Sequence, residues 1–402
     1  LCDESLRFTH GYTTSTLSAP AMGSILTGQY PYETGLHHNG GGELGVMSSS
    51  VESVAELALH AGFRTAFFAG SAPLLRRTGL HQGFEIFDDS ITTDSVRLHR
   101  PAHEVVDLFL QWQAQVQKSN ASTPFFAVLH FGDLQFPWAP TLDESGRPRE
   151  NTVKAQIDEI DSSLMKLWSA LEQRKQWDRT TITLAGLQGD LVDRREDEIP
   201  ALDLHSQMSH VALMVKEGRK AQYQWTPKSW TFDANVSLAD LGATLVYWVT
   251  GRDRSSESVR SFHALLKGPG EESELWRRDE RFLPTESAWA KWVLADTYPI
   301  RSSLRKGPYL FINDVRPMIY NTLTDAYEMA PLPSRSEKTQ VLQREFQAHA
   351  NELGFRPFPN VPAYEVRKEL WARELFSKRL SARVVTQSSL KERLLDDERT
   401  GT

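Results

Sequence analysis

The sequence predicts an α/β fold built around a mostly parallel sheet. Short apolar runs, rich in β-branched and aromatic residues, alternate along the chain with longer segments whose apolar residues recur every three or four positions. Strands buried on both faces read as continuous apolar runs, whereas a helix on the surface of a core shows one apolar stripe. Such an alternation of strand and helix patterns is typical of α/β proteins.

Four apolar runs fit buried strands of a parallel sheet. Each is too short for most helices and is enriched in Val, Ile, Phe or Thr. They lie at 64–70 (RTAFFAG), 124–131 (PFFAVLHF), 180–186 (TTITLAG) and 210–216 (HVALMVK).

Helical patterns lie before, between and after these runs. The segments 50–62 and 154–173 each place their apolar residues on one helical face. A third pattern, 237–251, ends at Gly251, a residue type that favours helix C-termini. We therefore expect helices to cover the sheet.

Beyond the third helix the pattern becomes charged and irregular. We expect a large α/β domain over 1–268, a small C-terminal α+β subdomain over 269–335, and a helical, partly charged tail over 336–402. A chain of 402 residues exceeds what one simple core usually supports, which agrees with this division. Within the tail, the basic amphipathic stretch 365–385 predicts a helix that packs on the body, with contact to a partner or a membrane as the alternative.

The composition argues against several classes of partner. The net charge of −7, from 45 basic and 52 acidic residues, provides no broad positive field, so we expect no nucleic-acid partner. Cys2 is the single cysteine and cannot form an intrachain disulfide or a thiolate metal site. No run of eighteen apolar residues occurs, so we expect membrane contact only through a segment outside this chain.

The segment 8–31, FTHGYTTSTLSAPAMGSILTGQYP, resembles the signature of the sulfatase family in the alkaline-phosphatase superfamily. Ser18 occupies the nucleophile position of that signature, Pro20 its proline position, and Met22 stands where sulfatases carry Arg. The resemblance implies the alkaline-phosphatase-like three-layer sandwich. Further segments similar to family motifs follow in register at 58–70, 79–89, 124–140, 180–190, 237–245 and 320–328.

The resemblance also implies a metal site whose ligand positions are degenerate in this chain. The family holds its cation with two acidic residues after its first strand and an Asp-His or Asp-Asn pair after a later strand. Leu187 and Gln188 occupy the later pair, and the resemblance places the first strand before the segment with which this chain starts. We expect Ser18 to start a helix at the carboxyl edge of the sheet, within side-chain reach of Gln188.

Charged groups are also missing from the positions that the family uses to hold the ester. Gln135 stands in place of a histidine, and the segment 70–74 (GSAPL) replaces an expected Lys and His. Together with Met22, these changes remove groups that grip the oxygens of a charged ester. His37 and His38 remain as candidate substrate-binding residues.

Two functions follow from these observations. A bound cation activates the nucleophile and stabilises charge in ester hydrolysis, so we predict loss of this activity, no cofactor, and a role as a binding or structural module. The alternative is an active sulfate- or phosphate-ester hydrolase or transferase that uses Ser18, a cation such as calcium, and His37, His38, His205 or His210 as base or ligand. The family resemblance implies an extracytoplasmic location.

Overall fold

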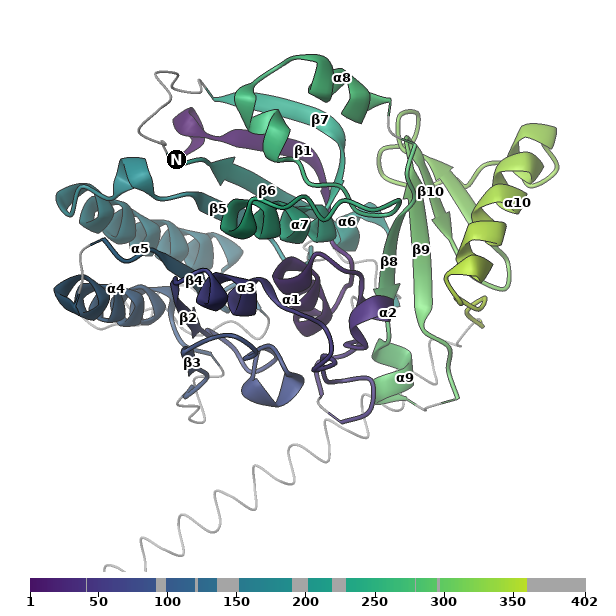
Figure 1. The fold of residues 1–402 in the computed structure, drawn as a ribbon. Helices are drawn as coiled ribbons and strands as arrows, with labels where there is room; N and C mark the ends of the chain where they lie inside the picture. The colour runs from purple at the N-terminus through teal and green to yellow at the C-terminus, as the bar shows by residue number, and fades with distance from the viewer. Residues whose placement is uncertain are drawn as a thin grey trace, which may run out of the picture.

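The computed structural model describes residues 1–40, 42–91, 99–119, 122–135, 152–189, 202–218, 229–278, 280–294 and 297–359. The predicted helix at 365–385 lies outside these residues. Two central sheets carry helices on their faces, and a third sheet lies beside them near the C-terminal end of the described chain (Figure 1). The predicted α/β fold is confirmed. Among the described helices, none combines the length and apolar character needed to cross a bilayer.

The first central sheet has four strands. In spatial order they are β5 (Ile182–Ala185), β6 (His210–Lys216), β1 (Leu6–Tyr12) and β7 (Trp230–Ser237). β1 runs parallel to β7, but β6 runs antiparallel to both β1 and β5. The prediction of a parallel strand at 210–216 was therefore wrong in direction. An apolar run reports burial and carries no information about which way its neighbours run.

The second central sheet is parallel throughout. It consists of β3 (Ile86–Asp88), β2 (Arg64–Phe68) and β4 (Phe125–Leu129), in that order. Both β3 and β4 pair with β2 in parallel register. The strands predicted at 64–70 and 124–131 are confirmed, together with their direction.

Helices pack on opposite faces of these sheets (Figure 1). Alternate residues of β4 point to two separate apolar clusters, with Phe126 and Val128 in the first and Phe125 and Leu129 in the second. The first cluster includes residues of α1, α3 and α7, and the second includes residues of α4 and α5. The bounds are α1 (Ser18–Thr27), α3 (Val54–His60), α4 (Ala102–Ser119), α5 (Val153–Gln173) and α7 (Leu238–Thr250).

The outer edges of β4 and β5 border a common core. β4 is the edge strand of its sheet and β5 is the edge strand of the other, so among the described residues each pairs with one neighbour only. All residues of both strands are only half-buried, although most are apolar. Because Phe126 of β4 and Ala185 of β5 both pack against the first apolar cluster, the same core supports the two sheets.

The third sheet is antiparallel. Its order is β11 (Met318–Asn321), β10 (Tyr309–Ile312), β9 (Arg301–Lys306) and β8 (Leu283–Ser287). The helix α10 (Glu337–Glu352) covers one face, at right in Figure 1. The remaining short helices are α2 (Pro31–Thr34), α6 (Ser206–Ser209), α8 (Glu271–Arg277) and α9 (Trp289–Val293).

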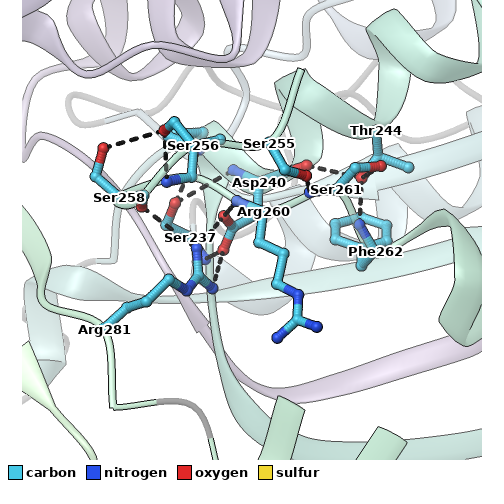
Figure 2. A network of polar contacts seen from close by, with 12 residues as sticks. Ser237, Asp240, Thr244, Ser255, Ser256, Ser258, Arg260, Ser261, Phe262 and Arg281 are labelled. Carbon is cyan, nitrogen blue, oxygen red and sulfur yellow. Dashed lines mark hydrogen bonds and ion pairs between the residues drawn. The ribbon is translucent and has the colours of Figure 1, made fainter. Parts of the chain in front are cut away.

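A buried carboxylate ties the third sheet to the body. Figure 2 shows Asp240, in the first turn of α7, accepting hydrogen bonds from the backbone N–H groups of Ser237 at 2.9 Å and Arg260 at 2.6 Å. The guanidinium of Arg281, just before β8, pairs with the same carboxylate at 2.8 Å. Asp240 thus joins the start of α7, a neighbouring loop and the approach to the third sheet.

Backbone hydrogen bonds make a second connection, next to the start of α1. Glu286 of β8 donates its N–H to the carbonyl of Thr14 at 3.0 Å, and Thr16 donates to the carbonyl of Glu286 at 3.2 Å. The hydroxyl of Thr285 donates to the carbonyl of Thr13 at 2.7 Å. The third sheet therefore fixes the loop that leads to Ser18.

Candidate functional site

Ser18 is the first residue of α1 and lies where the chain leaves the carboxyl end of β1. Its hydroxyl donates to Oε1 of Gln188 at 3.4 Å, and Gln188 follows the carboxyl end of β5. The predicted proximity of the two residues is confirmed. Among the described residues, this neutral amide is the hydrogen-bond partner of Ser18 Oγ, and no hydrogen bond joins that oxygen to a histidine or a carboxylate.

Leu187 has become part of the core. Its side chain packs against the first apolar cluster, and its carbonyl accepts a hydrogen bond of 2.6 Å from the hydroxyl of Thr13. The same hydroxyl lies 2.8 Å from the carbonyl of Ser15. The hydrogen bond between the Thr13 hydroxyl, after β1, and the Leu187 carbonyl, after β5, thus holds the loops after these two strands together.

The start of α1 is capped from outside the helix. The N–H of Ala19, next to Ser18, donates to Oδ1 of Asn39 at 2.9 Å. Free N–H groups at a helix start are well suited to anions, because they have no partner within the helix. Asn39 occupies one of these donors in this protein. Sequence reasoning missed this residue, because Asn39 lies 20 positions from Ala19 and reaches it from a separate loop.

His37 is paired with a buried carboxylate instead of with Ser18. Its Nδ1 lies 2.6 Å from Oε1 of Glu286, which is 1% exposed. Burial opposes a charge on His37, and Lys291 does so weakly, but the charge and the hydrogen bond of Glu286 outweigh both and raise the pKa of His37. The pair links the loop after α2 to β8.

His38 is a hydrogen-bonded loop residue. Its Nδ1 accepts from the N–H of Gly40 at 3.1 Å, so its Nε2 donates to the carbonyl of Glu43 at 3.0 Å. The ring stacks on Trp292 with a centroid distance of 5.4 Å. Burial lowers the pKa of His38, which favours the neutral ring. The prediction that His38 binds substrate stays untested.

The other candidate residues do not converge on Ser18. Met22 is buried in the first apolar cluster, and Gln135 is exposed, with its N–H donating to the carbonyl of Gly132 at 2.9 Å. His205 bonds to Asp203, and His210 bonds to the carbonyl of Thr9. Among the described residues, the structure therefore supplies no base next to the Ser18 hydroxyl.

Asp133, which follows β4, is buried at the carboxyl end of the second sheet. Its Oδ1 accepts from the N–H of Ala102 at 3.0 Å and so caps α4. Its Oδ2 has no partner, and burial raises the pKa of the carboxyl to about 6. Ser71 and His99 also hold buried polar atoms that lack partners. The segment 70–74 (GSAPL), which contributes Ser71 here, contains neither the Lys nor the His that the family resemblance predicts in that segment.

The described residues near Ser18 do not fit a divalent cation. Hard cations take several oxygen ligands, preferably carboxylates. The side chain of Leu187 has no atom that can ligate a metal. Oε1 of Gln188 is neutral and already accepts a hydrogen bond from the Ser18 hydroxyl. Across the part of the chain that the structure describes, no group of three or more His, Cys, Asp or Glu side chains is placed to hold a metal.

The fold and this corner define a class of protein. The sulfatase family model matches residues 1–250, so the chain belongs to the sulfatase family. Members of this family typically use a divalent cation, which makes the donor set at Leu187 and Gln188 a departure from the family pattern. No curated protein matches the chain in sequence.

Solved structures support the same fold. One similar protein was solved with its substrate D-glucosamine-2-N,6-O-disulfate, at 14% identity and a TM-score of 0.66, covering 88% of this chain and 92% of that chain. The phosphonate monoester hydrolase of Agrobacterium radiobacter has 14% identity, a TM-score of 0.65 and coverages of 88% and 89%. A Bacteroides thetaiotaomicron protein described with glycosaminoglycan metabolism has 18% identity, a TM-score of 0.65 and coverages of 92% and 90%. At these identities the likeness establishes the fold alone.

Proposed function

We propose that this protein is a sulfatase-family member that has lost metal-dependent ester hydrolysis and serves as a binding or structural module. The observation that carries the proposal is the contact between the Ser18 hydroxyl and the neutral Gln188 amide. In an ester hydrolase of this kind, the same position needs a cation or a base beside the nucleophile.

The physical argument concerns activation of the nucleophile. A serine hydroxyl attacks weakly unless a neighbouring base or a metal removes its proton. The amide oxygen of Gln188 accepts a hydrogen bond but is far too weak a base to take a proton at neutral pH. The histidines that could act as bases are engaged elsewhere, His37 with Glu286 and His38 with its own loop.

A second argument concerns the ester. Hydrolysis of a charged ester requires donors or cations that stabilise the developing oxyanion. Asn39 already occupies the Ala19 N–H beside Ser18, and Met22 lies in the apolar core. These contacts support a structural role for the residues around Ser18. They leave few hydrogen-bond donors that could hold a sulfate or phosphate group.

The alternative is an active sulfate- or phosphate-ester hydrolase or transferase with Ser18 as nucleophile. The serine at the nucleophile position, at the start of α1, favours this alternative. Two similar solved structures also favour it, since one was solved with a sulfated glucosamine substrate and the other is a phosphonate monoester hydrolase. Either role is compatible with the extracytoplasmic location that we propose from membership of the family.

Cation binding tests the proposal. Purified protein, dialysed against chelator and then titrated with calcium or magnesium by calorimetry, should take up no stoichiometric ion at this corner. Its melting temperature should not rise with added cation, because only an ion that binds the native state stabilises it. Stoichiometric binding that Gln188→Ala abolishes would instead support the active alternative.

A further inference from the structure

A small cavity lies between the body and the third sheet, apart from the Ser18 contact. Its lining comes from the loop that leads into α6, from the first two residues of α6, and from the segment after β11. The volume is about 40 Å³, room for roughly three water molecules at 10–15 Å³ each. A sugar does not fit, but the end of one side chain does. The lining residues are Asp203, His205, Ser206, Gln207, Ala326, Tyr327 and Glu328.

Asp203 and His205 form a close pair in this lining. Oδ1 of Asp203 lies 2.5 Å from Nδ1 of His205, and the rings of His205 and Tyr320 pack in a T-shaped arrangement at a centroid distance of 5.3 Å. Asp203 is 6% exposed, and its second oxygen, Oδ2, is buried without a hydrogen-bond partner. A buried carboxylate oxygen without a donor is costly, which favours a bound group that donates hydrogen bonds.

Glu328 is already satisfied. Its carboxylate accepts from the N–H of Ser206 at 2.8 Å and from the Ser206 hydroxyl, and it pairs with Arg305 at 3.4 Å. Arg305 in turn lies over the ring of Tyr12 at 4.2 Å. This network holds the two segments in place. Of the two carboxylates in the lining, Asp203 is therefore the one with an oxygen that lacks a partner.

The charges around the cavity favour a cation over an anion. The lining includes two carboxylates and no lysine or arginine. Just behind it, Arg305 balances Glu328, and Arg301 pairs with Asp314 at 3.1 Å. Burial opposes a charge on Asp203, but His205 and, more weakly, Arg301 outweigh it and lower the pKa of Asp203. When His205 is neutral, Arg301 and Arg305 face three carboxylates, those of Asp203, Asp314 and Glu328, and this excess of negative charge disfavours a sulfate or phosphate.

We propose that this cavity binds a primary ammonium group, such as the end of a lysine side chain or of a small alkylamine. The ammonium group is compact, fits the volume and donates three hydrogen bonds. Tyr327, which is 82% exposed, stands at the rim and offers a ring face to the cation or to the methylene groups that follow it.

The charge on His205 sets the pH dependence of this binding. Burial disfavours a charged His205, but the hydrogen bond and charge of Asp203, with a smaller contribution from Glu328, outweigh it and raise the pKa of His205. Arg301 on β9 opposes the shift, and the uncharged Tyr320 ring completes its surroundings. Protonated His205 neutralises Asp203, so the ammonium group should bind more tightly as pH rises through this pKa.

Ligand-observed NMR titration of the full chain tests the proposal, with n-butylammonium as probe and n-butanol as its uncharged match. Butylammonium should bind and butanol should not. A peptide with one lysine should bind at least tenfold more tightly than the same peptide with acetyl-lysine. Tighter binding of the lysine peptide than of butylammonium would identify a protein as the source of the amine, and equal binding would identify a small amine.

Variants locate the binding. Asp203→Asn should weaken butylammonium binding at least tenfold, whereas Asp158→Asn, an exposed carboxylate on α5, and Ser18→Ala should not change it. If Asp203→Asn fails to fold, the unmodified protein still tests the proposal, because its affinity for butylammonium must fall as pH is lowered through the pKa of His205. Butylammonium binding no tighter than butanol, or unchanged in a folded Asp203→Asn protein, overturns the proposal. Since Ser18→Ala leaves this cavity intact, the result does not depend on whether the protein hydrolyses esters.

Discussion

The hydroxyl of Ser18 lies 3.4 Å from the amide oxygen of Gln188, although 170 positions separate the two residues in the chain. The contact joins the segment after β1 to the segment after β5, at the corner where the family places a nucleophile and a metal. Both partners are neutral. We infer the loss of ester hydrolysis chiefly from this pairing of an intact nucleophile position with an uncharged neighbour.

The contact should contribute little to stability. A hydrogen bond between neutral groups has a net value of about 1 kcal/mol, and 3.4 Å is long for two oxygens. Ser18→Ala should therefore change the free energy of unfolding, measured with urea, by no more than about 1 kcal/mol. A loss above about 3 kcal/mol would show that Ser18 is a major structural residue, since such losses come from buried networks or cavities.

Asp240 should be far more important for stability. Its buried carboxylate pairs with Arg281 and accepts two backbone N–H groups, so Asp240→Ala leaves an uncompensated buried guanidinium and unpaired donors (Figure 2). We expect a loss of about 3–5 kcal/mol in urea unfolding. The matched change Glu257→Ala, at an exposed residue nearby, should stay within about 0.5 kcal/mol. Equal effects of the two changes would contradict the assigned role of Asp240.

The His37 and Glu286 pair should make stability depend on pH. Because the folded-state pKa of His37 is raised above 6.5, its contribution is fully present below that value and is lost as pH rises through the higher folded value. His37→Gln should therefore cost more stability at pH 6 than at pH 9. Urea unfolding of both proteins at the two pH values measures this difference, and a cost independent of pH would argue against a charged pair.

Asp133 should act in the opposite sense to an ion-paired carboxylate. Burial raises its pKa from 3.8 to about 6, so its contribution is fully present below pH 3.8 and is lost as pH rises through 6. Over that range the wild type should lose up to about 3 kcal/mol relative to Asp133→Asn. The asparagine keeps an oxygen that can cap α4 at the Ala102 N–H. Parallel pH profiles for the two proteins would contradict the raised pKa.

Local sequence patterns predicted the strands with a continuous apolar run and the helices with one apolar face. The strands at 64–70 and 124–131 have continuous apolar runs, and the predicted helices at 154–173 and 237–251 carry one apolar face each. β1 and β7 were not predicted, because polar residues interrupt both sequences and leave no continuous apolar run. The direction of β6 was wrong because apolar character does not encode strand direction.

The candidate site was predictable only where a motif marked it. Ser18 and Gln188 were placed together because each lies in a segment that resembles a family motif. Glu286, in contrast, reaches His37 across 249 positions from an antiparallel strand. Asn39 caps α1 from a separate loop. Partners of this kind depend on how the third sheet and the loops pack, and no local spacing in the sequence reveals them.

Comparison of the unmodified protein with its Ser18→Ala variant, on aryl sulfates and on phosphate mono- and diesters, tests the central claim most directly. Both proteins are assayed with and without added calcium or magnesium, and the melting temperature confirms that the variant is folded. We predict equal rates for the two proteins under every condition, because an unassisted serine hydroxyl is a weak nucleophile. Hydrolysis by the unmodified protein that Ser18→Ala abolishes would contradict the claim and establish an active ester hydrolase.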